Sequence, residues 1–196
     1  MKKFEFLESR VAVLSRDDID TDQIIPARFL RTTERSGLGT HLFEDWRYQP
    51  DGEARGEFVL NRPESAGVGI LLAGRNFGCG SSREHAVWAL LDFGIRAVIA
   101  EGFADIFRKN ALRNGLLPVS VDADTHRRCL EVAQKGEPFH LDLERRTASA
   151  GAELSFSFDV DPFARVCMLD GVDDLEYILR HTDAIASFES RENARA

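Results

Sequence analysis

The segment 76–85 (Asn-Phe-Gly-Cys-Gly-Ser-Ser-Arg-Glu-His) contains the residue types best suited to chemistry. It follows an apolar run that predicts a buried strand and precedes a pattern that predicts a helix. A helix N-terminus offers unpaired N–H groups and partial positive charge, which favour a bound anion. Gly78 and Gly80 let a ligand come close to the backbone. Arg83 adds a guanidinium group that can hold a carboxylate through two hydrogen bonds.

Ser81 lies at the mouth of this predicted positive pocket. An alkoxide there would be stabilised by the same dipoles, so the serine could act as a base toward an acidic C–H group. The same segment also fits a structural role, because Ser81 and Glu84 have the spacing of a capping box with Ser81 as N-cap. Composition alone favours the structural interpretation.

Cysteine and histidine offer weaker candidates. A helix N-terminus would favour a thiolate at Cys79, but no base partner is identifiable in the sequence. A single histidine in a first helical turn, here His85, is more often structural than a ligand. Cys79, Cys129 and Cys167 are far apart, whereas metal or iron–sulfur sites draw on closely spaced ligands. We therefore expect no metal site in this chain, and free thiols fit a reducing compartment.

The elements that must position these residues alternate in type. Apolar runs over 68–73, 97–100 and 116–121 predict buried strands, and helical periodicity over 82–93 and 103–114 predicts the helices between them. Glycines follow both helices and provide their C-terminal ends. The succession strand, helix, strand, helix, strand indicates parallel pairing with right-handed crossovers.

The flanking regions complete an α/β chain. A short apolar run at 11–14 is a further candidate strand, and 125–135 has a helical pattern. Residues 139–160 alternate between apolar and polar, which indicates an antiparallel hairpin. We expect a loop-rich insertion over 32–66 and a helical tail over 170–196, in which residues 175–190 are mostly helical.

Size and charge narrow the class of protein. The chain has 196 residues and no obvious linker, so we expect one domain over 1–196. Its formal net charge is -8 and it has no basic run, which disfavours a nucleic-acid-binding role. The first ten residues lack the apolar core of a signal peptide, and no apolar run is long enough for a membrane span. The expected location is the cytoplasm.

Several motifs together resemble one known family. Residues 80–85 (Gly-Ser-Ser-Arg-Glu-His), after a glycine turn and before a helix, resemble the swivelling domain of the aconitase family. Residues 20–26 (Asp-Thr-Asp-Gln-Ile-Ile-Pro) are similar to the family's D-T-D-x-I-I-P segment, and 37–47 resemble an insertion of the bacterial isopropylmalate dehydratase small subunits. The resemblance extends from about residue 5 to residue 190 and includes further family-like segments at 103–107, 114–118 and 181–185.

The resemblance implies roles for individual residues. In the family the first serine of the pair is the catalytic base and the arginine binds a substrate carboxylate, which implies these roles for Ser81 and Arg83. Ser82 and Gly80 would contribute contacts to the substrate, and Asp22 would be an active-site residue that positions groups near the serine. In this view Ser81 can serve as both cap and base.

Arg31 lies in the segment 28–33, which resembles the loop that helps choose the substrate in this family. It could bind a distal carboxylate or face solvent, and both alternatives stay open. The insertion favours isopropylmalate as the substrate. The run Leu-Arg-Thr at 30–32 also resembles some homoaconitase small subunits, so homoaconitate or a methylated malate is the alternative substrate.

The resemblance also implies a fold, a partner and a reaction. The fold would be the swivelling β/β/α domain, with a parallel βαβαβ core and a barrel-like antiparallel portion. The chain would be active only with a large subunit, which would hold a [4Fe–4S] cluster that acts as a Lewis acid on the leaving hydroxyl. The reaction would be dehydration and rehydration of a small dicarboxylate in leucine biosynthesis. A non-catalytic anion-binding regulatory module is the alternative from a different class.

Overall fold

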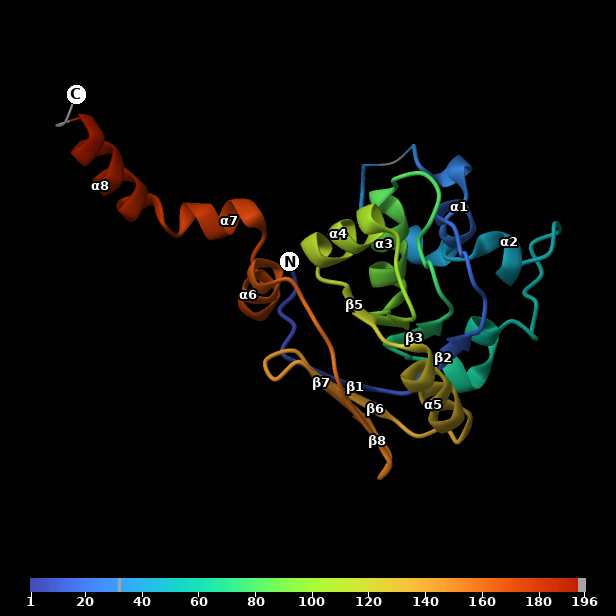
Figure 1. Ribbon diagram of the computed structural model, residues 1–196. Helices are drawn as coiled ribbons and strands as arrows, with labels where there is room; N and C mark the ends of the chain where they lie inside the picture. The colour runs from blue at the N-terminus through green and yellow to red at the C-terminus, as the bar shows by residue number, and fades with distance from the viewer. Residues whose placement is uncertain (32, 194–196) are drawn as a thin grey trace.

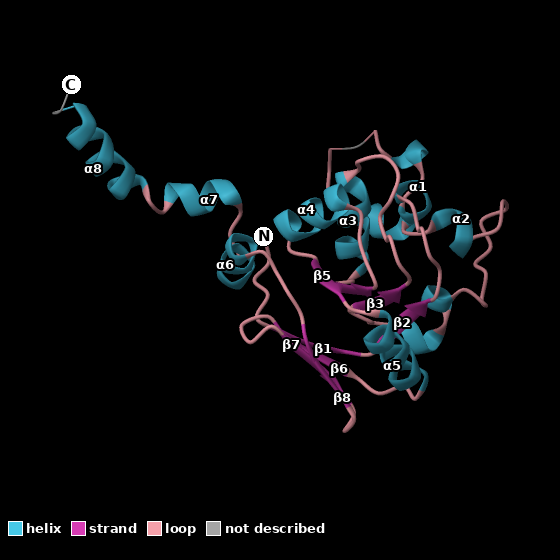
Figure 2. Ribbon diagram, in the orientation of Figure 1, coloured by secondary structure: helices cyan, strands magenta, loops and turns pink. Residues whose placement is uncertain are grey.

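The computed structural model describes residues 1–31 and 33–193, and its strands form two sheets that lie one above the other (Figures 1 and 2). The parallel sheet has the order β2-β3-β4-β5, with bounds Val11–Leu14, Ile70–Ala73, Ala97–Ala100 and Leu117–Ser120. The antiparallel sheet has the order β1-β6-β7-β8, with bounds Phe6–Ser9, Phe139–Asp142, Thr147–Ala150 and Leu154–Ser157.

The parallel sheet confirms the predicted alternation of strands and helices. Strands β3 and β4 are buried along their whole length, as their continuous apolar sequences require. Helix α3 (Glu84–Phe93) connects β3 to β4, and α4 (Asp105–Asn114) connects β4 to β5. Both helices end at a glycine in the left-handed conformation, Gly94 and Gly115, as expected.

The antiparallel sheet is larger than the predicted hairpin. The alternating pattern over 139–160 folds into β6, β7 and β8, and in β6 Phe139 and Leu141 are buried whereas His140 and Asp142 are partly exposed. Strand β1 adds to β6 and was not predicted, since its outward face is exposed and its pattern is short. Only Arg10 separates β1 from β2, so consecutive strands enter different sheets and hold them together.

The parallel sheet is covered on both faces, which gives three layers. On one face, side chains such as Leu71 and Val98 pack against α3 and α4. On the other, Ile70 and Ile99 pack against the antiparallel sheet, α5 (Ala123–Gln134) and α6 (Pro162–Asp170). The loop between β3 and α3 and the segment after β2 both begin at the carboxyl ends of the parallel strands.

The insertion is more ordered than a set of loops. It contains the helical turns η2 (Leu38–His41), α2 (Glu44–Arg47), η3 (Val59–Asn61) and η4 (Pro63–Ser65). The buried Arg47 guanidinium donates to the backbone oxygens of Gly39, Thr40 and Leu42 and to Oδ1 of Asn61. One buried cation therefore ties the carbonyl groups of η2 and its C-cap to the Asn61 side chain of η3, an arrangement that composition did not reveal.

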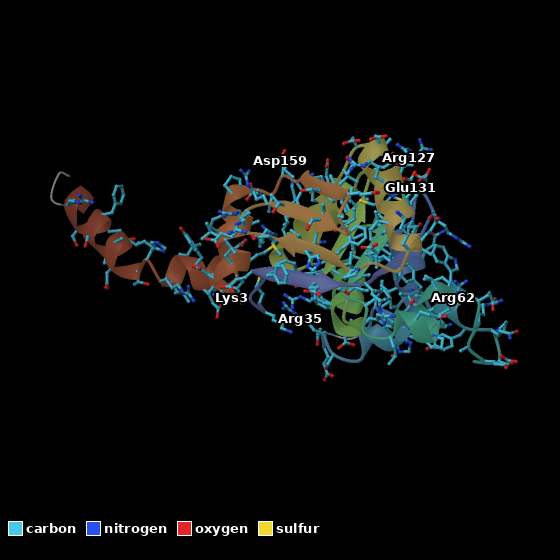
Figure 3. All side chains as sticks on the ribbon, turned by 90° about the horizontal axis from the view of Figure 1, so that it is seen from below. Lys3, Arg35, Arg62, Arg127, Glu131 and Asp159 are labelled. Atoms are coloured by element: carbon cyan, nitrogen blue, oxygen red, sulfur yellow. The ribbon has the colours of Figure 1, made fainter. Side chains whose placement is uncertain are left out.

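The C-terminal region leaves the body as two successive helices, α7 (Asp174–Leu179) and α8 (Thr182–Asn193) (Figure 1). The helical prediction for 175–190 is confirmed, with a break between the two helices. The N-terminus lies at the base of this region, where Lys3 is seen in Figure 3 and where the Phe4 N–H donates to the Met168 oxygen at 2.9 Å. Among the described residues, no helix has the length and apolar character needed to span a membrane.

Gly39 provides a test of the packing between the insertion and α3. A Cβ at this position would lie 2.5 Å from the backbone nitrogen of Phe93, whereas nothing lies within 4 Å of a Cβ at Gly56. We expect Gly39→Ala to lower the free energy of unfolding by about 1–3 kcal/mol, as overpacking does. Urea denaturation measures the change, and Gly56→Ala is the matched control that should leave stability nearly unaltered. Equal stabilities of the two variants would contradict this packing.

Candidate active site

The candidate site begins with a backbone pairing between two segments that are distant in the sequence. The loop between β3 and α3 runs beside the segment that follows β2. The Gly78 N–H donates to the Ile19 oxygen at 2.7 Å, and the Thr21 N–H donates to the Cys79 oxygen at 2.9 Å. The Thr21 hydroxyl also donates to the backbone carbonyl oxygen of Ser81 at 2.7 Å. These bonds bring together the two motifs that the sequence singled out separately.

Two glycines allow the loop to follow this course. Gly78 has φ +76°, and a Cβ on it would lie 2.2 Å from the ring of Phe107, on α4. Gly80 has φ +84° and passes close to the Asp20 carboxylate. A residue with a side chain would be strained at either position and would displace Phe107 at the first. The loop is therefore pressed against the N-terminal turn of α4.

A hollow of about 260 Å³ lies between these segments and the start of α4. The N-termini of α3 and α4 both border it, and their N-cap residues, Arg83 and Ala104, make no side-chain cap hydrogen bond. Their first N–H groups stay available to an anion in the hollow. The hollow is lined by Thr21, Gly78, Gly80, Ser81, Ser82, Arg83, Ala104, Asp105, Ile106 and Phe107.

The capping-box prediction for Ser81 is wrong. Helix α3 begins at Glu84, and its N-cap is Arg83, whose backbone is extended (φ -137°, ψ 108°). The chain stays extended past the serine because Thr21 holds the backbone carbonyl of Ser81 and because Gly80 is in the left-handed conformation. Glu84 accepts a hydrogen bond from the Asn114 side chain at 2.7 Å instead. The exposed Ser81 hydroxyl is not used by a cap, so it can meet a ligand.

Arg83 and Asp22 form an ion pair at the edge of the hollow, with Nη1 donating to Oδ1. The Arg83 side chain is only 16% exposed, whereas that of Asp22 is 49% exposed. The hydrogen bond from Arg83 lowers the pKa of the Asp22 carboxyl below its ordinary value. Asp22 is positioned by the capping box of α1 (Thr21–Ile24), in which the Asp20 carboxylate accepts the N–H groups of Asp22 and Gln23.

The predicted residues are therefore brought together, with one exception. Ser81, Ser82, Gly80 and Arg83 line the hollow, and Asp22 reaches it through Arg83. Arg31 is exposed in the turn after η1 (Ala27–Phe29) and does not line the hollow. The neighbouring Thr32 of the same predicted loop lies outside the described residues.

Cys79 is not activated as a nucleophile. Burial first, and then the negative charges of Asp20 and Asp18, raise the pKa of its thiol, which donates to the Asp18 oxygen at 3.3 Å. Two other residues were not predicted from the sequence: Thr21, which bonds to the loop, and Phe107, which packs under it. Thr21 stands inside a motif that the sequence does reveal, but no sequence signal indicates its partner.

The described residues also offer no candidate metal centre. They contain no group of three or more His, Cys, Asp or Glu side chains arranged to hold a metal ion. Cys129 and Cys167 are buried in the hydrophobic core. A cluster of the kind expected for the family does not fit the donor set that the structure describes, so we assign no residue of this chain to one.

Comparisons with known proteins agree with this geometry. A model of the aconitase C-terminal domain matches residues 1–124. A 3-isopropylmalate dehydratase small subunit from Anaeromyxobacter dehalogenans is 53% identical over 189 residues, which are 96% of this chain and 98% of that protein. One from Chloroflexus aurantiacus is 48% identical and covers 97% of this chain and 96% of its own length.

A solved structure extends the likeness to three dimensions. The crystal structure of a 3-isopropylmalate dehydratase from Methanocaldococcus jannaschii matches this chain with a TM-score of 0.68 and 30% sequence identity. The match covers 94% of this chain and 99% of that one. The two chains therefore share their architecture over nearly their whole length.

The ion pair predicts a measurable titration. Because Asp22 has a lowered pKa in the folded chain, the pair is intact at neutral pH and is lost only as the pH falls through that lowered value. We expect Arg83→Gln to move the Asp22 titration back up toward the ordinary aspartate range. Carboxyl-carbon NMR shifts between about pH 2 and 6 would follow it.

Arg75→Gln is the control for this titration, since Arg75 belongs to the same loop but pairs with Asp17 at 2.9 Å. It should leave the Asp22 midpoint unchanged. An Asp22 midpoint that is the same in wild type and Arg83→Gln would show that the arginine does not hold this carboxylate.

Proposed function

We infer the function of this chain from one premise: it belongs to the family of 3-isopropylmalate dehydratase small subunits, which carry the aconitase C-terminal domain. We propose that it is the small subunit of a heteromeric hydro-lyase that interconverts 2-isopropylmalate and 3-isopropylmalate in leucine biosynthesis. The observation that carries the proposal is the likeness to these relatives over nearly the full length of both chains. The hollow beside the exposed Ser81 supports it, because it offers polar groups to a bound anion.

We propose that Ser81 is the base. In the dehydration step its alkoxide takes the proton from the carbon next to a carboxylate, a double bond forms, and the hydroxyl leaves the neighbouring carbon. Rehydration then adds water across the double bond, so that the hydroxyl and the hydrogen have changed places between the two carbons. A serine of ordinary pKa is a poor base, so the role needs local positive charge. The N-termini of α3 and α4 and the Arg83 guanidinium supply such charge around the hollow, where the Asp105 carboxylate opposes it.

The carboxylate next to the reacting carbon is assigned to Arg83 and the backbone of the loop. Asp22 binds Nη1 of the guanidinium, and we assign the other nitrogens of Arg83 to the substrate. Gly80 and Ser82 border the same hollow and would add backbone or hydroxyl contacts. Arg31, exposed on a separate turn, is proposed to meet the distal part of the substrate.

The remaining half of the chemistry is assigned to a large subunit. The [4Fe–4S] cluster of the family would be held there, outside this chain. We propose that the whole chain 1–196 acts as one swivelling domain, with the insertion 32–66 and the tail 170–196 as parts of it. The three cysteines are free, which supports a reducing compartment, the cytoplasm.

Reconstitution tests the proposed function directly. The chain is mixed anaerobically with a large subunit that carries an intact cluster, and the absorbance of the unsaturated intermediate is followed from 3-isopropylmalate. We expect turnover in the mixture and none with either subunit alone, because each holds part of the site. Homoisocitrate and a methylated malate are the competing substrates.

Turnover of homoisocitrate or a methylated malate in place of isopropylmalate would move the substrate assignment and keep the mechanism. Binding of the two subunits without turnover of any of the three acids would favour a non-catalytic anion-binding module.

Ser81→Ala tests the base. We expect kcat of the assembled enzyme to fall by about a hundredfold or more, since a positioned base contributes roughly that much, with little change in KM. Ser82→Ala is the neighbouring control, for which the main expected effect is on KM. Sedimentation confirms that both variants still assemble with the large subunit. Wild-type kcat in Ser81→Ala would exclude the serine-base role.

A further inference from the structure

The exposed large apolar side chains of the chain are gathered on one side. Scattered apolar residues are normal on a surface, but a continuous row of them marks an interaction site. In the part of the chain that the structure describes, Phe6 on β1 is the exception, and the others lie on the first turn of α4 and on α6, α7 and α8. These are Ile106 (52% exposed), Phe163 (43%), Val166 (37%), Leu175 (63%), Ile178 (52%), Leu179 (60%), Ile185 (41%) and Phe188 (58%).

This row begins at the candidate active site. Asp105 and Ile106 line the hollow that contains Ser81. Asp105 also lines a groove of about 720 Å³, together with Phe163 on α6 and Asp174, the first residue of α7. The hollow and the groove therefore adjoin at Asp105, and the groove leads to the start of the C-terminal helices. Its lining is mixed: charged side chains such as Arg108 and Asp159 stand beside the apolar ones. We call the helices α7 and α8 the C-terminal arm.

The arm is anchored at its base. The rings of Phe163 and Tyr177 meet edge to face with centroids 5.0 Å apart. An ion pair joins Arg180 to Asp170 at 3.4 Å. These contacts set the direction in which α7 leaves α6, and Figure 1 shows the arm extending away from both sheets.

Beyond its base the arm has an apolar face that is exposed to solvent in the part of the chain that the structure describes. Leu175, Ile178 and Leu179 are spaced three and four residues apart, so they share one side of α7. Ile185 and Phe188 are three apart on α8. Helices of six and twelve residues are marginal in water by themselves, because most helical stability in proteins comes from packing. The arm needs a surface to lie on.

We propose that the row from Ile106 to Phe188 is the docking surface for the large subunit, with the arm seated in an apolar groove of that partner. The inference rests on the proposed function, in which the partner must cover Ser81 to complete the site. A protein that covers the hollow meets Ile106 first and Phe163 next, and the same surface continues into the arm.

The charge of the arm indicates which side chains the groove of the large subunit should carry. Acidic side chains outnumber basic ones between residues 173 and 191. Asp173 and Glu176 form the capping box of α7, and Asp174 pairs with Arg113 at 3.5 Å. An apolar groove with basic side chains at its rim is complementary to such a helix pair. The arm would thus add affinity for the partner while contributing nothing to the chemistry in the hollow.

Phe188→Ser tests the proposal, and the chain offers a matched control. Phe188 and Phe6 are equally exposed, at 58%, but Phe6 lies on β1, away from the row. We expect Phe188→Ser to raise the Kd for the large subunit about tenfold or more, as the loss of a buried aromatic contact does, and Phe6→Ser to leave it unchanged. Calorimetry or sedimentation measures Kd without substrate. Both variants should reach wild-type kcat when the small subunit is saturating.

Three outcomes are distinguishable. A Kd for Phe188→Ser and for Ile178→Ser equal to that of wild type would overturn the docking surface. A dimer of the isolated chain that Phe188→Ser abolishes, with Kd for the large subunit unaltered, would overturn it in favour of a second copy. A Phe188-sensitive Kd in a complex that turns over no isopropylmalate would support the docking surface while contradicting the proposed substrate.

Discussion

The structure of the candidate site depends on one backbone pairing, in which the segment after β2 runs beside the loop after β3. The bonds from Gly78 to Ile19 and from Thr21 to Cys79 fix the two chains in register. This register places the α1 capping box next to the start of α3, and so places Asp22 against Arg83. It also delays the first turn of α3, which leaves the Ser81 hydroxyl outside the cap. A shift of one residue would break these hydrogen bonds and separate Asp22 from Arg83.

The pairing also explains what could be predicted from the sequence and what could not. The strands and helices of the parallel sheet follow from local patterns, since continuous apolar runs and glycine ends are visible in one segment at a time. The buried Arg47 has nearby partners, in 39–42 and at Asn61, but they lie in irregular turns that no periodic pattern reveals. Strand β1 depends on β6, which is far away in the sequence. The capping-box prediction failed for the same reason, because its local signal was overridden by a bond from Thr21.

The electrostatics of the site must work within a chain of net charge -8. Asp22 offsets much of the charge of Arg83, so the guanidinium by itself does not make the hollow strongly positive. The N-termini of α3 and α4 add fixed backbone dipoles that cannot be neutralised by proton transfer, and these act against the acidic residues of their own first turns, Glu84 and Asp105. Asp22 thus acts mainly on geometry: it holds the arginine in one orientation, which a flexible side chain at the surface would not keep.

The exposure of the candidate site to water affects the reactivity of Ser81. Ser81 and Ser82 face water, in which an alkoxide is a strong base that cannot persist at neutral pH and the dipoles around it are screened. The same groups act far more strongly once water is removed from the hollow. A partner that covers this face would therefore change the reactivity of Ser81 without moving any residue of this chain. The need for a second subunit follows from the dielectric around the serine as much as from any group that the partner contributes.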